Sequence, residues 1–167
     1  MAKGEITIKS KEEIAILREG GKRLSFILGE VAKKVKVGIT KKELNDFAEK
    51  LVYEGGDKPS FKNYKPDGAR ICFPASLCVS VNDEIVHGIP DEYALKDGDI
   101  VGLDLGLEHK GMFTDMAVTV GVGNVSESSK KIMEATEKSL SAGIKAVKAG
   151  VYTGDIGNAI EKVAKAA

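Results

Sequence analysis

Residues 102–118 constrain the fold of this chain more than any other stretch, because they read as two β-strands joined by a polar, glycine-marked turn. Leucine occupies every second position of the first strand, and apolar residues alternate in the same way along the second. Each strand therefore has one apolar face and one face that carries a single acid, Asp104 or Asp115. The pattern predicts an antiparallel hairpin with the rest of the chain packed against its apolar face.

The register of this hairpin decides how the two acids lie. A symmetric two-residue loop at His109 and Lys110 would pair Asp104 directly with Asp115, with Cβ atoms roughly 4.5–5.5 Å apart. Like charges at that distance repel unless a cation neutralises them, so this register favours a divalent metal site. Alternatively, Gly111 takes the left-handed position of a three-residue turn, and Asp115 moves to the other face as an unrelated surface acid. The spacing alone leaves both alternatives open.

Composition indicates one ordinary domain and argues against several classes of protein. The 167 residues, 43% of them hydrophobic, suffice for a core. The 25 basic and 25 acidic residues cancel, so the charge balance gives no sign of a nucleic-acid or membrane partner. We find no pattern of a secretory signal and no apolar run long enough to cross a bilayer. Cys72 and Cys78 lack zinc-site spacing and predict free thiols, so we expect a cytoplasmic protein.

Helices are predicted before the extended region. Ser10 with Glu13, and Thr40 with Glu43, form two capping boxes. The first starts a long helix with one apolar stripe, and the second starts a shorter helix that ends at a pair of glycines. After a polar loop, residues 70–81 read as an extended segment interrupted by a proline.

The two histidines lie in different settings. His87 belongs to a loop in which Gly-Ile-Pro follows it. Loop residues on a rigid scaffold often carry chemistry, although a solvated side chain is the simpler explanation for a single loop histidine. His109 lies at the predicted tip of the hairpin, and that position explains it without a function.

The helical segments repeat with a spacing of 112 residues. Without gaps, residues 35–38 fall on residues 147–150, and residues 48–51 fall on residues 160–163. Each copy predicts a long helix, a glycine, a short connection and a second helix. Two amphipathic helices can resemble each other by chance, but the shared glycine favours a duplication. Since the second copy stops within its second helix, we expect strands to follow it in a longer chain.

The segments around the hairpin resemble a known family. Three features closely resemble type I methionine aminopeptidase: the string ending in His-Gly-Ile-Pro at residues 82–90, the turn at residues 96–101, and the two spaced aspartates. The resemblance covers essentially all of the chain, as the N-terminal portion of that family. It implies an α/β (α+β) pita-bread fold, in which outer helices surround a curved antiparallel sheet with a pseudo-twofold duplication. Residues 1–167 would then be a single pita-bread catalytic domain, truncated at its C-terminal end, with the second half incomplete.

The resemblance also implies which residues form the site. Asp104 resembles the family's bidentate metal ligand, and Asp115 resembles the aspartate that bridges two divalent ions, which are Co, Mn, Fe or Zn. His87 resembles the catalytic histidine that hydrogen-bonds the substrate beside the scissile peptide. Cys78 matches a residue of the methionine pocket, and Phe73 falls where the family usually has a pocket tyrosine. The remaining family ligands, one histidine and two glutamates, have no counterpart here.

The implied activity is removal of the N-terminal methionine from nascent proteins by metal-assisted hydrolysis, with ribosome association as a further implied contact. Asp67 and Arg70 stand where other pocket residues are expected, which leaves the pocket shape open. An Xaa-Pro peptidase or creatinase-like hydrolase is one alternative, and a non-catalytic binding module is another. Because two carboxylates are too few ligands for two ions, we expect the 167-residue chain alone to be inactive.

Overall fold

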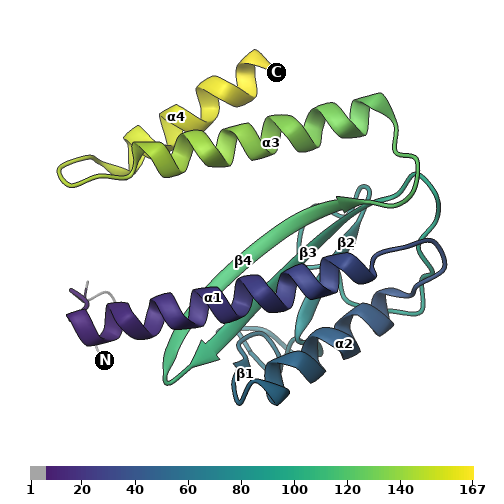
Figure 1. The fold of residues 1–167 in the computed structure, drawn as a ribbon, viewed down its shortest axis with the longest axis horizontal. Helices are drawn as coiled ribbons and strands as arrows, with labels where there is room; N and C mark the ends of the chain where they lie inside the picture. Colours follow the sequence, from purple (N-terminus) through teal and green to yellow (C-terminus); the bar gives the residue numbers. More distant parts are fainter. Residues whose placement is uncertain (1–6) are drawn as a thin grey trace. The chain divides into compact units, whose positions relative to one another are not determined.

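The computed structural model describes residues 7–167, which divide into two compact units, residues 7–123 and residues 124–167 (Figure 1). The first unit contains two helices and four strands: α1 (Lys11–Lys34), α2 (Lys41–Glu54), β1 (Lys58–Pro59), β2 (Leu77–Val81), β3 (Ile100–His109) and β4 (Met112–Gly121). The second unit contains α3 (Glu127–Ala146) and α4 (Thr153–Ala166). Among the described residues, none of these helices has the length and apolar character of a membrane span.

Both predicted helix starts are confirmed. At the start of α1 the Ser10 hydroxyl accepts a hydrogen bond from the Glu13 amide, and the Glu13 carboxylate accepts one from the Ser10 amide. Thr40 and Glu43 form the same reciprocal pair at the start of α2. These contacts satisfy amide groups that have no partner within the helix, so the sequence alone determines where each helix begins.

Strand β3 lies at the centre of an antiparallel sheet. β4 pairs with its whole length, while β1 and β2 pair with different parts of it. Every second residue of β3 is buried against the helices, where α1 contacts β3 and β4, and α2 contacts β1 and β2 (Figure 1). The helices therefore cover one sheet face, and the acid-bearing face points away from them. The largest fully buried side chains of this core are Leu24, Leu28, Val31, Leu44, Val52, Leu77, Val79, Leu95, Val101, Leu103, Leu105 and Leu107.

The extended segment predicted for residues 70–81 is wrong in its first half, because only Leu77–Val81 form a strand. The preceding residues close a loop on themselves: the Asn63 amide donates to the Phe73 carbonyl, and the Phe73 amide donates to the Tyr64 carbonyl. Pro74 then has no amide hydrogen to offer a sheet. The strand β2 therefore begins only after this hydrogen-bonded loop, at Leu77.

The turn of the hairpin lies one residue later than the sequence predicts. His109 pairs with Met112, so the loop consists of Lys110 and Gly111, with φ angles of 49° and 79°. Two positive φ angles are typical of a type I′ turn, whose twist suits an antiparallel hairpin, and glycine takes its second position without a steric penalty. The predicted loop at His109 and Lys110 would have placed Lys110 in that second position.

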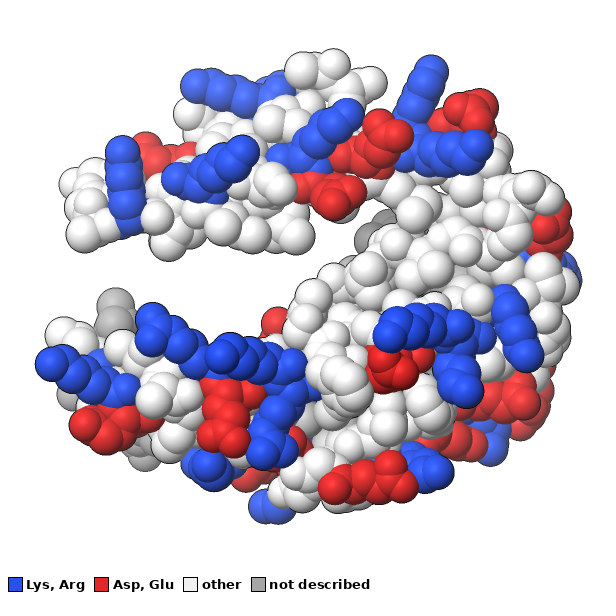
Figure 2. All heavy atoms as spheres, viewed as in Figure 1, with Lys and Arg blue, Asp and Glu red and all other residues white. Residues whose placement is uncertain are grey.

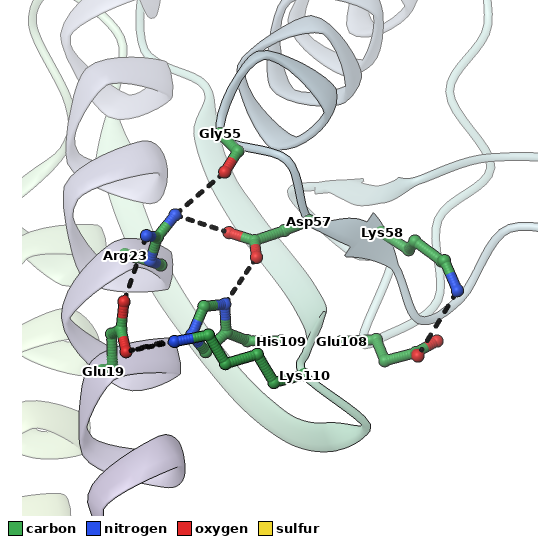
Figure 3. Close-up of polar contacts among 8 residues, drawn as sticks. All are labelled: Glu19, Arg23, Gly55, Asp57, Lys58, Glu108, His109 and Lys110. Atoms are coloured by element: carbon green, nitrogen blue, oxygen red, sulfur yellow. Dashed lines mark hydrogen bonds and ion pairs between the residues drawn. The ribbon is translucent and has the colours of Figure 1, made fainter.

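This shift makes His109 a buried strand residue, which corrects its assignment to the tip of the hairpin (Figure 3). Its Nδ1 lies 2.6 Å from Oδ1 of Asp57, a buried carboxylate directly after α2. Its Nε2 lies 3.3 Å from Oε2 of Glu19 on α1, close enough for an ion pair but not aligned as a hydrogen bond. The imidazole therefore connects the end of β3 to both helices.

Two cations complete this polar cluster of Glu19, Arg23, Asp57, His109 and Lys110 (Figure 3). The Arg23 guanidinium donates to Asp57, to Glu19 and to the Gly55 carbonyl. Lys110 donates to Glu19, and with His109 and Arg23 it lowers the pKa of the Glu19 carboxyl to about 2. The cluster holds the tip of the hairpin against the end of α2 and the first half of α1.

The second unit repeats the helix ends and the glycine connection of the first helix pair. Lys34 and Ala146 end α1 and α3, and they lie 112 residues apart, as do the two ends of α2 and α4. Gly38 and Gly150 occupy the same place between the helices, with φ angles of 87° and 85°. The predicted duplication is therefore present in the backbone. In α3 and α4, however, several of the larger apolar residues stay exposed, namely Ile132, Leu140, Ile144 and Ile160.

We expect His109→Ala to lower the free energy of unfolding by about 2–4 kcal/mol, because it leaves the buried Asp57 carboxylate with one partner fewer. Urea denaturation followed by far-UV circular dichroism measures this. Lys58→Ala is the control, since its ion pair with Glu108 is largely exposed and its loss should cost no more than about 0.5 kcal/mol (Figure 3). Equal effects of the two substitutions would contradict a structural role for the buried imidazole.

Candidate metal and substrate site

A cavity of about 570 Å³ lies on the sheet face opposite the helices. Asp104, Asp115 and His87 contribute its polar side chains. Residues 61–74 contribute an apolar wall, with Phe61, Tyr64, Ile71 and Phe73 among its members. A few converging polar groups beside an apolar wall are typical of a small-ligand site.

The two aspartates lie on the same face of the hairpin, as predicted, but not directly opposite each other. Asp104 pairs with Ala117, and Asp115 pairs with Gly106, so the acids are diagonal neighbours. Because side chains alternate along a strand, a register shift of two residues keeps both acids on one face. The direct pairing expected from a loop at His109 and Lys110 is wrong, and the alternative with the acids on opposite faces is wrong too. Asp104 and Asp115 nevertheless both line the same cavity.

The surroundings of the two carboxyl groups disfavour negative charge. Burial raises the pKa of Asp104 above its usual value, and the nearby charge of Asp115 raises it further, while His87 acts in the opposite direction. Burial also raises the pKa of Asp115, whose carboxyl faces the cavity although the residue as a whole is exposed. The Oδ1 atom of Asp104 is buried and has no hydrogen-bond partner. A cation would satisfy that atom and reduce the repulsion between the acids.

The two carboxyl groups suit a bound metal ion, but they are too few to form a complete metal site. No group of three or more His, Cys, Asp or Glu side chains among residues 7–167 is arranged to hold a metal ion. Asp104 and Asp115 would contribute carboxylate oxygens, which suit hard or borderline divalent ions. The described residues therefore offer part of a coordination sphere.

His87 reaches the cavity from an exposed loop. Its φ angle of 58° is uncommon for a residue with a side chain. The next residue, Gly88, packs directly on β2: its carbonyl accepts from the Val79 amide, and its own amide donates to the Ser80 hydroxyl. A Cβ atom at Gly88 would collide with the Val79 carbonyl, so only glycine allows this approach.

The predicted pocket residues Cys78 and Phe73 both line the cavity. Cys78 is buried beside Asp104, and burial together with the two aspartate charges raises the pKa of its thiol to about 12, so it stays protonated. Neither cysteine forms a disulfide, as predicted. Phe73 meets Phe61 edge to face, with ring centroids 6.5 Å apart.

The sequence did not reveal the part that Phe61 plays. A Cβ atom at Gly106 would lie 2.6 Å from Cε1 of the Phe61 ring and closer still to the Ser60 hydroxyl, so the glycine between the leucines of β3 makes room for both residues at the start of this wall. A glycine on the acid-bearing face of a strand is the signal that could have indicated this. Asp67 and Arg70 do not line the cavity, whereas the neighbouring Ala69 and Ile71 do.

Comparison with known proteins identifies the family. The family model described as metallopeptidase family M24 matches residues 15–167. The chain belongs to this family. The M24 assignment agrees with the resemblance of the hairpin and the His-Gly-Ile-Pro string to metal-dependent aminopeptidases.

Among M24 relatives, methionine aminopeptidase 1 of Bacillus subtilis is 42% identical over 156 residues, which are 93% of this chain and 60% of that protein. The methionine aminopeptidase of Clostridium perfringens is 41% identical over 161 residues, 96% of this chain and 62% of that protein. The chain thus spans about three fifths of the length of the curated relatives that it matches.

Solved structures confirm the predicted pita-bread fold. The crystal structure of methionine aminopeptidase from Rickettsia prowazekii superposes with a TM-score of 0.91 at 31% identity, covering 97% of this chain and 63% of that one. A prolidase from Pyrococcus horikoshii superposes with a TM-score of 0.81 at 18% identity, covering 95% of this chain and 43% of that one, and this likeness concerns the fold alone. The M24 fold therefore accounts for the sheet, the outer helices and the repeated helix pair.

In a metal-free chain with chelator present, we expect Asp104→Asn to raise the free energy of unfolding at pH 7. A carboxyl whose pKa is higher in the folded chain destabilises that chain when it ionises, so the penalty appears as the pH rises through the folded pKa and is absent at low pH. The gain should therefore shrink as the pH falls to roughly 4 and below.

Asp46→Asn is the matched control, because Lys42 lowers the pKa of Asp46 and its ionisation stabilises the fold. Urea denaturation at pH 7 should give opposite signs for the two substitutions. A loss of stability in Asp104→Asn at pH 7 would contradict the account of these acids.

Proposed function

We propose that this chain forms the N-terminal part of an enzyme that removes the N-terminal methionine from proteins. The observation that carries the proposal is the cavity in which Asp104, Asp115 and His87 meet beside an apolar wall. Its support is the 42% identity to methionine aminopeptidase 1 of Bacillus subtilis over 93% of the chain.

In this proposal, Asp104 and Asp115 hold two divalent ions together with ligands from outside the described residues. Bound ions would acidify a water molecule and polarise the peptide carbonyl. His87 would hydrogen-bond the substrate beside the bond that is cleaved, from its place at the edge of the same cavity. Which metal the site takes, Co, Mn, Fe or Zn, stays open.

The apolar wall would receive the methionine side chain. Phe61 and Phe73 form the fixed, edge-to-face part of this wall, and Cys78 presents a neutral thiol at its floor. One methylene in such a pocket is worth only about 1–3 kcal/mol, so selectivity would come from the shape of the wall more than from any single contact.

The cellular setting belongs to the same proposal. Nascent proteins are the expected substrates, which places the enzyme in the cytoplasm and near the ribosome. Lys and Arg residues are interspersed with Asp and Glu on the face drawn in Figure 2. That face offers no basic patch in support of ribosome contact, which rests on the family resemblance.

We expect the 167-residue chain to release no methionine from a Met-Ala-Ser peptide with added Co²⁺ or Mn²⁺, because two carboxylates leave each ion mostly hydrated. Calorimetry should give a Kd on the order of 0.1–1 mM or weaker, the range of sites poor in ligand charge. The Bacillus subtilis relative is the positive control. Robust release by the short chain would overturn the ligand count, and release only from Xaa-Pro peptides would favour the prolidase alternative.

In a chain long enough to complete the site, we expect His87→Ala to lower turnover by about 10²–10⁴-fold while metal binding is kept. Turnover and metal content of the same preparation measure this. Equal loss of metal would mean that His87 is a ligand. Unchanged turnover would mean that the loop histidine is only a solvated side chain.

A further inference from the structure

Lys41 is buried where a lysine is unfavourable. It is the first residue of α2, directly after the N-cap Thr40, and its side chain is only 3% exposed. Lysine is almost never fully buried without a partner, and a positive charge at a helix N-terminus is opposed by the helix dipole. Helix stability therefore gives no reason for a lysine here.

The partner of Lys41 is Glu84, which belongs to the loop of residues 82–89, called here the His87 loop. The Lys41 ammonium donates to both Glu84 oxygens at 3.0 Å, and Oε2 of Glu84 also accepts from the Val81 amide at 2.8 Å. Asp91, just beyond the loop, approaches the same ammonium at 3.9 Å. One buried cation thus meets an acid inside the His87 loop and an acid directly after it.

The His87 loop depends on such polar anchors, because it has little apolar packing. Ile85 is 91% exposed and Val86 is 63% exposed. Asn82 exchanges backbone and side-chain hydrogen bonds with Ile100 at one end, and Gly88 bonds to β2 at the other. Between these ends the loop must hold His87 in a left-handed conformation, which surrounding contacts have to maintain.

We propose that the Lys41–Glu84 ion pair is a positioning device for His87, fixing the loop so that the imidazole stays at the cavity beside Asp104. Lys41 and Glu84 touch neither the cavity nor any reacting atom in this account, and they act only through the loop. The inference rests on the proposed function in one respect, since it takes His87 to be the group whose position matters.

The test uses the 167-residue chain and nuclear magnetic resonance. The chain has only two histidines, His87 and His109, so the side-chain spectrum reports one loop imidazole and one buried imidazole in the same sample. In Lys41→Met and in Glu84→Gln, the His87 ring resonances should move by more than a linewidth. The amides of Val81 and Glu84 should exchange with solvent about tenfold faster or more. The His109 resonances should stay in place.

Lys42→Met is the matched control, because Lys42 is the next residue of the same helix and its ion pair with Asp46 is exposed on both sides. It should leave His87 and the loop amides unchanged. If Lys41→Met does not fold, Glu84→Gln decides, since Glu84 is partly exposed and glutamine still offers an acceptor to the Val81 amide.

An unchanged His87 spectrum in folded Glu84→Gln overturns the proposal. It is also overturned if the His109 resonances move as much as those of His87, because the pair would then stabilise the whole unit and not the loop. Neither result depends on peptidase activity, so a failure here is distinguishable from a failure of the proposed function.

Discussion

The register of the β3–β4 hairpin is the constraint on which the rest of the structure depends. The type I′ turn at Lys110 and Gly111 fixes which residues pair, and the pairing fixes which side chains face the helices. One face of β3 becomes the buried leucine layer, and the other presents Asp104 to a cavity. A slip of one residue would bury the acid and expose the leucines, so folding and site formation select the same register.

The polar cluster at the end of this hairpin reinforces that register. His109 lies on the helix side of the sheet because it continues the alternate buried positions of Leu105 and Leu107 along β3, and there it meets Asp57. Gly20 of α1 lets the helix approach, since a Cβ atom there would lie 3.3 Å from the His109 Cβ atom. A shifted hairpin would leave the buried Asp57 carboxylate without its imidazole, which is costly in a buried site. The polar cluster at the turn thus stabilises the strand pairing that places Asp104 and Asp115 on one face.

Local rules explain what could be predicted from the sequence. Capping boxes satisfy amides within a few residues, so the starts of α1 and α2 were predictable, and period-two alternation places both acids on one face for either two-residue turn. The exact pairing of residues on β3 and β4 could not be predicted, because His109–Lys110 and Lys110–Gly111 are both plausible turns until the φ angles are known. Lys41 with Glu84 and Asp57 with His109 lie 43 and 52 residues apart, and no local pattern announces such pairs. The role of Phe61 likewise depends on a contact with Gly106 that only the folded sheet creates.

Titration of the 167-residue chain with Mn²⁺ tests the central claim most directly, namely that the two acids share a cation site in the cavity. A paramagnetic ion broadens the resonances of nearby nuclei, so the site can be located even when binding is weak. The account predicts that amide signals of Asp104, Asp115 and Cys78 and the ring signals of His87 broaden first, while those of His109 stay sharp. Broadening that begins at exposed acids elsewhere, such as Asp46 or Glu127, and spares Asp104 and Asp115 would contradict it.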